Sequence, residues 1–193
     1  MKKILVILIA VIAVAALAVL IVSVLAPLPQ EDAPDMKETT PAPTGVNTEK
    51  AEPEQAPDFT VYDDNNAPIS LSMMQGKVTV VNFWATWCGY CVVEMPEFEQ
   101  AYKTYGDEVN FMMVDLISGA ETPEKAKQFI EENGYTFPVY YDNDQDAYAK
   151  YSLTSIPRTL IIAPDGTLLR EYKGAMNKTT LYSIIEAALS KAD

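Results

Sequence analysis

The chain has 193 residues, a formal net charge of −13, two cysteines and no histidine. The missing histidine excludes hydrolases built on a Ser–His–Asp triad and most zinc or haem sites, so no metal site is expected. The acidic balance argues against binding to nucleic acid or to anionic lipid surfaces.

An apolar segment opens the chain after Met1-Lys2-Lys3. Residues 4–26 contain one polar side chain, Ser23, and as a helix they would be about 35 Å long, enough to cross a membrane. The alternative is a cleaved signal peptide, whose apolar region is normally shorter; Pro27 directly after the candidate cleavage site disfavours it. Because the lysines come first, we expect residues 1–26 to form a cytoplasmic stub and a single-pass anchor in the cell membrane, with the rest extracytoplasmic.

The next segment has the composition of a tether. Residues 27–57 hold seven of the 13 prolines and seven acidic residues, without an aromatic residue or an apolar periodicity. Such a segment is predicted to be a disordered linker. Globular patterning begins near Phe59, so residues 58–193 are predicted to form one domain, long enough to bury its own core.

Strand and helix patterns alternate along this domain. Two short strands, 59–62 and 69–72, flank a turn, and 78–84 is apolar enough for a strand buried on both faces. Later segments with strand patterns are 109–116, 137–141, 159–163 and 168–173. Helices are expected after Cys91, after the cap Thr122-Pro123, over 146–151, and at the C-terminus, where Leu181, Ile184, Ile185, Ala188 and Leu189 would be buried. This order predicts an α/β sandwich with a mixed sheet.

Cys88 and Cys91, the only cysteines, lie between the strand 78–84 and the following helix. Unpaired N–H groups and the positive end of the helix dipole favour a thiolate at such a position. Cys88 would then be the exposed nucleophile, and Cys91 would resolve the mixed disulfide. The alternatives are a purely structural disulfide or half of a zinc site, but zinc requires about four ligands.

The strand VVNFW, the site Trp87-Cys88-Gly89-Tyr90-Cys91 and the following Glu94-Met95-Pro96 resemble the active site of thioredoxin-fold proteins. The resemblance is specifically to the TlpA/ResA-like membrane-anchored thiol–disulfide oxidoreductase family, and it covers roughly residues 57–190. It implies a thioredoxin-like three-layer sandwich with an N-terminal β extension. The segment 122–151 would be an inserted strand and helix.

The resemblance also implies a substrate-binding surface around the cysteines. Pro157 would be cis and lie against the Cys88–Cys91 pair, and the backbone of Ile156 would bond an extended substrate segment by strand addition. Trp87, Gly89 and Tyr90 would complete this surface. The alternative for Pro157 is an ordinary trans proline at the start of an edge strand.

Glu94 is the candidate base of the site. It follows Cys91 by three residues on the same helical face, and the resemblance implies a partly buried carboxylate that accepts a proton as Cys91 becomes a nucleophile. The alternative is a solvated glutamate in the first turn. Asn82 replaces the buried aspartate of many cytoplasmic thioredoxins, and Arg158 replaces a more usual threonine; Arg158 would either steer acidic substrates or pair with a local carboxylate.

The remaining expectations concern function. Trp84 and Trp87 would line the site and shield the thiols, although Trp84 could equally be a core residue. Gly89-Tyr90, between the cysteines, lacks the histidine found in strongly oxidising relatives, which predicts that the protein is a reductant. The expected activity is reduction of disulfides in exported proteins, apocytochrome c being one candidate, by a monomer that a membrane thiol donor re-reduces. No cofactor is expected beyond the redox-active disulfide. The alternatives are a peroxiredoxin-like peroxidase, whose threonine-containing motif is not found, and a non-catalytic interaction module.

Overall fold

The computed structural model describes residues 54–192. The predicted anchor and most of the predicted linker lie outside the described residues, and among the helices that are described none has the length and apolar character needed to cross a membrane. The last residues of the predicted linker contact the domain: the Ala56 N–H donates to the Gly166 carbonyl (3.0 Å), and the Leu168 N–H donates to the Glu54 carbonyl (2.9 Å). Residues 54–57 of the predicted linker therefore belong to the domain.

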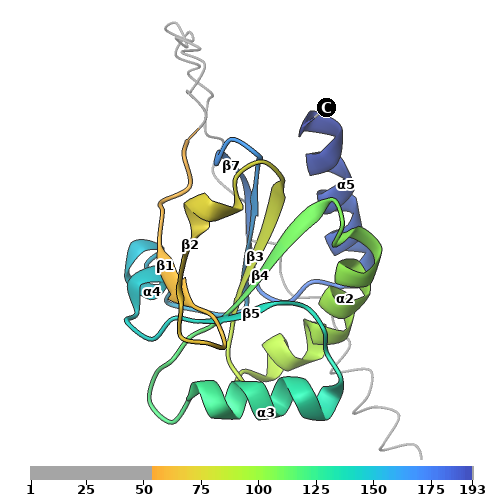
Figure 1. Ribbon diagram of the computed structural model, residues 1–193. Helices are drawn as coiled ribbons and strands as arrows, with labels where there is room; N and C mark the ends of the chain where they lie inside the picture. Colours follow the sequence, from red (N-terminus) through yellow and green to blue (C-terminus); the bar gives the residue numbers. More distant parts are fainter. Residues whose placement is uncertain (1–53, 193) are drawn as a thin grey trace, which may run out of the picture. The chain divides into compact units, whose positions relative to one another are not determined.

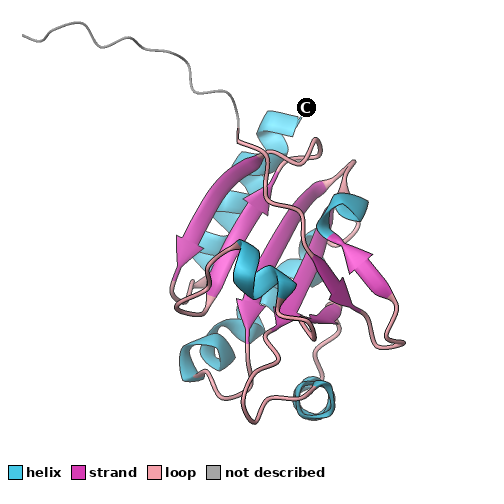
Figure 2. Ribbon diagram, turned by 90° about the vertical axis from the view of Figure 1, so that its left-hand side faces the viewer, coloured by secondary structure: helices cyan, strands magenta, loops and turns pink. Residues whose placement is uncertain are grey.

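Within residues 54–192, a seven-stranded mixed sheet forms the centre of the domain (Figure 1; Figure 2). In spatial order its strands are β2 (Pro68–Ser70), β1 (Thr60–Tyr62), β5 (Val139–Tyr141), β4 (Val109–Asp115), β3 (Val78–Trp84), β6 (Arg158–Ile162) and β7 (Leu168–Lys173). The central strands β3, β4 and β5 are parallel, and the other neighbouring pairs are antiparallel. The predicted mixed sheet is confirmed.

Helices cover both faces of this sheet (Figure 1). Side chains of α2 (Gly89–Tyr105), α3 (Pro123–Asn133) and α5 (Lys178–Ala192) pack on one face. The 3₁₀ helix η1 (Leu71–Met74) and α4 (Asp146–Lys150) pack on the other face. This is the thioredoxin-like three-layer sandwich that the resemblance implied.

The N-terminal extension and the insertion meet at one edge of the sheet. β1 and β2 form an antiparallel pair, and β1 joins β5 where Tyr62 is the register partner of Tyr141. The predicted strand 69–72 is shorter than expected, because the chain turns into η1 after Ser70. The Asp58 carboxylate accepts hydrogen bonds from the N–H and the hydroxyl of Ser72 (both 2.9 Å), which holds this turn.

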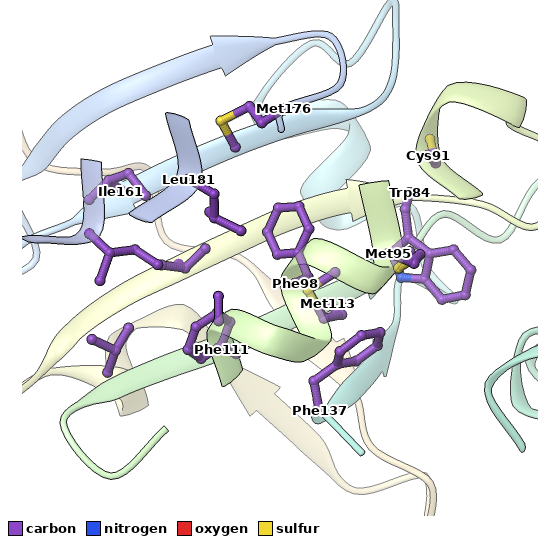
Figure 3. Packing of buried hydrophobic residues seen from close by; sticks show 14 of the residues in the cluster. Trp84, Cys91, Met95, Phe98, Phe111, Met113, Phe137, Ile161, Met176 and Leu181 are labelled. Atoms are coloured by element: carbon purple, nitrogen blue, oxygen red, sulfur yellow. The ribbon is translucent and has the colours of Figure 1, made fainter. Parts of the chain in front are cut away.

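The buried core on the α2 side includes both cysteines, and Figure 3 shows Cys91 at one end of it. Trp84, Met95 and Phe98 are fully buried there, and Figure 3 shows the Trp84 ring beside Met95. α5 buries four of its five predicted core residues, whereas Leu189 is only partly buried near the end of the helix. The site thus rests on close-packed core, which limits the freedom of its side chains.

Replacing Thr122 by alanine is expected to destabilise the domain by about 1 kcal/mol. Thr122 is the N-cap of α3, and its hydroxyl accepts a hydrogen bond from the Lys125 N–H (3.3 Å). Urea denaturation measures the effect, and Thr122→Ser, which keeps the hydroxyl, should stay close to the parent. Equal stability of all three proteins would contradict the cap.

Candidate active site

Cys88 and Cys91 form a disulfide at the start of α2. Cys88 is the N-cap of this helix, and its sulfur accepts a hydrogen bond from the Cys91 N–H (3.2 Å). That N–H is one of the donors that a helix leaves unpaired at its N-terminus. The geometry places the positively polarised N–H groups of the α2 N-terminus beside Cys88 Sγ, where they would stabilise a thiolate after reduction.

The two sulfurs differ in access. The Cys88 residue is 7% exposed, whereas Cys91 is fully buried. An incoming thiolate or disulfide can therefore reach Cys88 Sγ first. This difference fits the predicted division into an attacking and a resolving cysteine.

Pro157 follows a cis peptide bond, as the resemblance implied. The carbonyl oxygen of Ile156 lies 3.8 Å from Cys88 Sγ. Sixty-eight residues of sequence separate these two groups, and the antiparallel pairing of β6 with β3 brings them together. The predicted substrate-binding backbone is thus adjacent to the reactive sulfur.

Glu94 lies on α2, three residues after Cys91, and is 1% exposed. Its Oε1 accepts a hydrogen bond from Asn82 Nδ2 (2.8 Å), and its Oε2 accepts one from the Met176 N–H (2.8 Å). Burial raises the pKa of Glu94 to about 7, against the lowering effect of these two hydrogen bonds. The alternative of a solvated glutamate is wrong, and a carboxyl with this pKa can gain or lose a proton near neutral pH.

The aromatic residues around the cysteines divide into core and surface. Trp84 is fully buried and packs against Phe129, with ring centroids 5.7 Å apart. Trp87 and Tyr90 are 62% and 76% exposed, so their rings lie largely in solvent and do not shield the sulfurs. Gly89 is the first residue of α2 and is exposed, and a Cβ added to it would meet no atom of another segment within 4 Å, so the surface beside Cys88 is open.

Comparison with known proteins decides the family. A model of the AhpC/TSA family matches residues 53–170, more than half of the chain. The chain belongs to the AhpC/TSA family. The thioredoxin-like protein YneN of Bacillus subtilis is 33% identical over 127 residues, which cover 66% of this chain and 74% of that protein. The thiol-disulfide oxidoreductase ResA of Bacillus subtilis is 30% identical over 133 residues, covering 68% and 73%.

A solved structure has the same fold. The thiol:disulfide interchange protein of Chlorobium tepidum TLS, a thioredoxin family protein, is 28% identical with a TM-score of 0.63. The match covers 72% of this chain and 98% of that one. Together with the Cys88–Cys91 disulfide, these relatives identify the activity: this AhpC/TSA-family chain is a thiol–disulfide oxidoreductase.

Several site contacts had no signal in the sequence. Met176 and Thr159 hold the Glu94–Asn82 pair, since Asn82 Nδ2 also donates to Thr159 Oγ1 (3.0 Å). Arg158 is paired with Glu171 of β7 and donates to the Tyr151 carbonyl (2.7 Å), which favours the local-pairing alternative over substrate steering. Within residues 54–192, no group of three or more acidic or cysteine side chains could hold a metal ion.

Proposed function

We propose that the protein is an extracytoplasmic, membrane-tethered reductase that acts on disulfides of exported proteins. Cys88 would attack the substrate disulfide, Cys91 would release the reduced substrate, and a membrane thiol donor would re-reduce the resulting Cys88–Cys91 disulfide. Apocytochrome c is one candidate substrate. The proposal takes the protein to be a monomer anchored through residues 1–26.

The free backbone of Ile156 is the observation that most supports a protein substrate. Within the described chain, neither its N–H nor its carbonyl oxygen takes part in a backbone hydrogen bond. An extended peptide can pair with such groups by strand addition, and the 3.8 Å separation between the carbonyl oxygen and Cys88 Sγ would bring its disulfide to the nucleophile. A small peroxide would make no use of this backbone.

An apolar surface flanks the same position. Trp87, Tyr90 and Val93 are all more than 60% exposed although they are large apolar or aromatic residues. Beside Trp87, a groove of about 430 Å³ runs to Ile156 and includes Leu116, Tyr148 and Leu153. Large exposed apolar side chains around a reactive sulfur favour an unfolded or extended protein segment as the occupant.

Trp87→Ala is expected to raise the KM for a disulfide-bearing protein substrate about tenfold, because an exposed tryptophan at a contact surface contributes about 1–2 kcal/mol to binding. The rate with the small substrate dithiothreitol should change little. Met73→Ala is the matched control, since Met73 is 64% exposed in η1 and does not line the groove. Equal KM values for the two variants would contradict the surface assignment.

Location and substrate are tested with the full chain in cells. Cys91→Ser should accumulate mixed disulfides with exported proteins, and a membrane-impermeant maleimide should label its Cys88 in intact cells after mild reduction. Release of a mature chain that begins at Pro27 or later would refute the tether. Labelling only after cell lysis would refute the outward orientation.

The direction of electron flow is tested by the reduction potential of the Cys88–Cys91 couple. The absence of a histidine between the cysteines predicts a reducing couple, because the Cys88 thiolate lacks an additional positive neighbour. Equilibration with glutathione or dithiothreitol buffers measures the potential. A value near the strongly oxidising end, about −120 mV, would overturn the reductase proposal.

A further inference from the structure

Asp115, the last residue of β4, is a buried carboxyl group without a hydrogen-bond partner. Its side chain is fully buried, and in the described chain neither of its carboxyl oxygens has a partner. An unpaired carboxylate in such a place is strongly unfavourable, so the group is expected to bind a proton instead. Burial, and then the charge of Glu121, raise the pKa of Asp115 to about 8.

The neighbours of Asp115 on the sheet supply no positive charge. Its register partners are Trp84 on β3 and Tyr141 on β5; the Trp84 ring N–H is also buried without an acceptor in the described chain. The Tyr141 hydroxyl donates to Asp64 (2.8 Å). Burial, that hydrogen bond and the charges of Asp64, Asp115 and Glu124 raise the pKa of Tyr141, so Tyr141 stays neutral.

The adjacent loops contribute two further acids. The Asp142 carboxylate is turned to the start of α4, where it accepts hydrogen bonds from the Ala147 and Tyr148 N–H groups (3.1 and 2.8 Å). Glu121 is 3% exposed, and its charge acts on Asp115. Glu121 bonds Thr86, which follows Trp84, the register partner of Asp115, by two residues, so both acids lie at the same end of β3 and β4.

Glu121 also holds the loop that carries the reactive cysteine. Its Oε2 accepts a hydrogen bond from the Thr86 hydroxyl (2.7 Å), and its Oε1 accepts one from the Thr86 N–H (3.3 Å). Thr86 precedes Cys88 by two residues, and the Cys88 N–H donates to the Ala85 carbonyl (3.1 Å). A change at Glu121 is thus passed directly to the backbone that presents Cys88.

We propose that Asp115, held in its protonated form, and Glu121 form a pair of buried acids that positions the Thr86–Cys88 loop for thiol–disulfide exchange. While Asp115 holds its proton, Glu121 keeps its two hydrogen bonds to Thr86. Loss of the proton creates two like charges in a buried space, and their repulsion displaces Glu121 from the loop. Asp115 is a positioning residue in this scheme, and its role rests on the exchange function of Cys88–Cys91.

The test is the rate at which dithiothreitol reduces the Cys88–Cys91 disulfide of the full chain between pH 6 and 9.5. The rate constant is expressed per dithiothreitol thiolate, so that the ionisation of the reagent drops out; no protein thiol titrates in the oxidised protein. For the parent protein we expect a fall of about tenfold through a transition near pH 8, since small displacements of reacting groups have effects of at least this size.

Three variants make the test specific. Asp115→Asn, which resembles the protonated acid in shape, should match the parent at pH 6 and show no transition. Glu121→Gln should also show no transition in the rate, because an ionised Asp115 then has no like charge to displace, while the Asp115 carboxyl itself should lose its proton at lower pH. Glu124→Gln removes an exposed acid of α3 and should leave the profile unchanged.

Carbon-13 NMR of the Asp115 carboxyl in the parent protein provides a second measurement that needs no variant. It should titrate near pH 8, together with a shift of the Thr86 amide. A pH profile that is the same in Asp115→Asn and in the parent would overturn the positioning role alone, as would an Asp115 carboxyl ionised at pH 6. A disulfide that dithiothreitol fails to reduce at any pH would overturn the exchange function and this role with it.

Discussion

Cys88→Ser is expected to reduce disulfide-reductase activity to the rate of the uncatalysed exchange, a loss of at least about a thousandfold. Cys88 Sγ is the more accessible sulfur of the pair, and Cys88 is the N-cap of α2. Its sulfur accepts a hydrogen bond from the Cys91 N–H. A serine hydroxyl at this position would not ionise near neutral pH and could not attack a disulfide. Turnover of a single-disulfide peptide, with dithiothreitol as electron donor, measures the effect.

Cys91→Ser is the matched variant, because it leaves the attacking sulfur in place. Its first attack on the peptide should proceed, and the mixed disulfide should then persist, since the buried second sulfur is missing. Mass spectrometry of the quenched reaction detects this species. If Cys88→Ser still attacked the peptide and Cys91→Ser did not, Cys91 would be the attacking cysteine and Cys88 the resolving one. If either variant lost disulfide reduction but still consumed peroxide, the peroxidase alternative would be favoured.

The parts of the fold that the sequence predicted well have strong local signals. β3 was predicted with its observed bounds because Val78–Trp84 is an almost uninterrupted apolar run, as a strand covered on both faces requires. The strand 168–173 and the start of α3 at Thr122-Pro123 were also found, the latter from a cap followed by a proline. In each case a few adjacent residues determine the local structure.

The contacts that the sequence could not predict join distant segments. Met176 reaches Glu94 across 82 residues, and Glu121 reaches Thr86 across 35. Neither residue lies in a motif, because a backbone N–H carries no sequence signal and an isolated glutamate resembles any surface acid. The same reason left Arg158 undecided, since its partner Glu171 is found only through the pairing of β6 with β7.

Glu94→Gln is expected to slow turnover about a hundredfold at pH 8, within the range usual for loss of a general base. Glu94 follows Cys91 by nearly one helical turn and, with a pKa of about 7, is ionised at pH 8 and able to accept the Cys91 proton. In the parent protein, activity should therefore rise through pH 7 as Glu94 loses its proton. In the variant this rise should disappear, as a pH profile of the release of reduced peptide would show.

The same substitution changes how stability depends on pH. Because the pKa of Glu94 is raised from 4.5 to about 7, the folded protein binds the proton more tightly than the unfolded chain does. This group's contribution is then fully present below pH 4.5 and falls by about 3 kcal/mol as the pH rises through 7. The difference in unfolding free energy between the parent and Glu94→Gln should fall by this amount over that range.

Glu97→Gln, on the same helix and half-buried, is the control for removal of an acid from α2. Its activity profile should keep the rise through pH 7. If the unfolding free energies of Glu94→Gln and the parent differ by the same amount at every pH between 4.5 and 7, Glu94 is ionised over that range in the folded protein. In that case the two hydrogen bonds from Asn82 and Met176 outweigh the cost of burial, and Glu94 cannot exchange a proton with Cys91 near neutral pH.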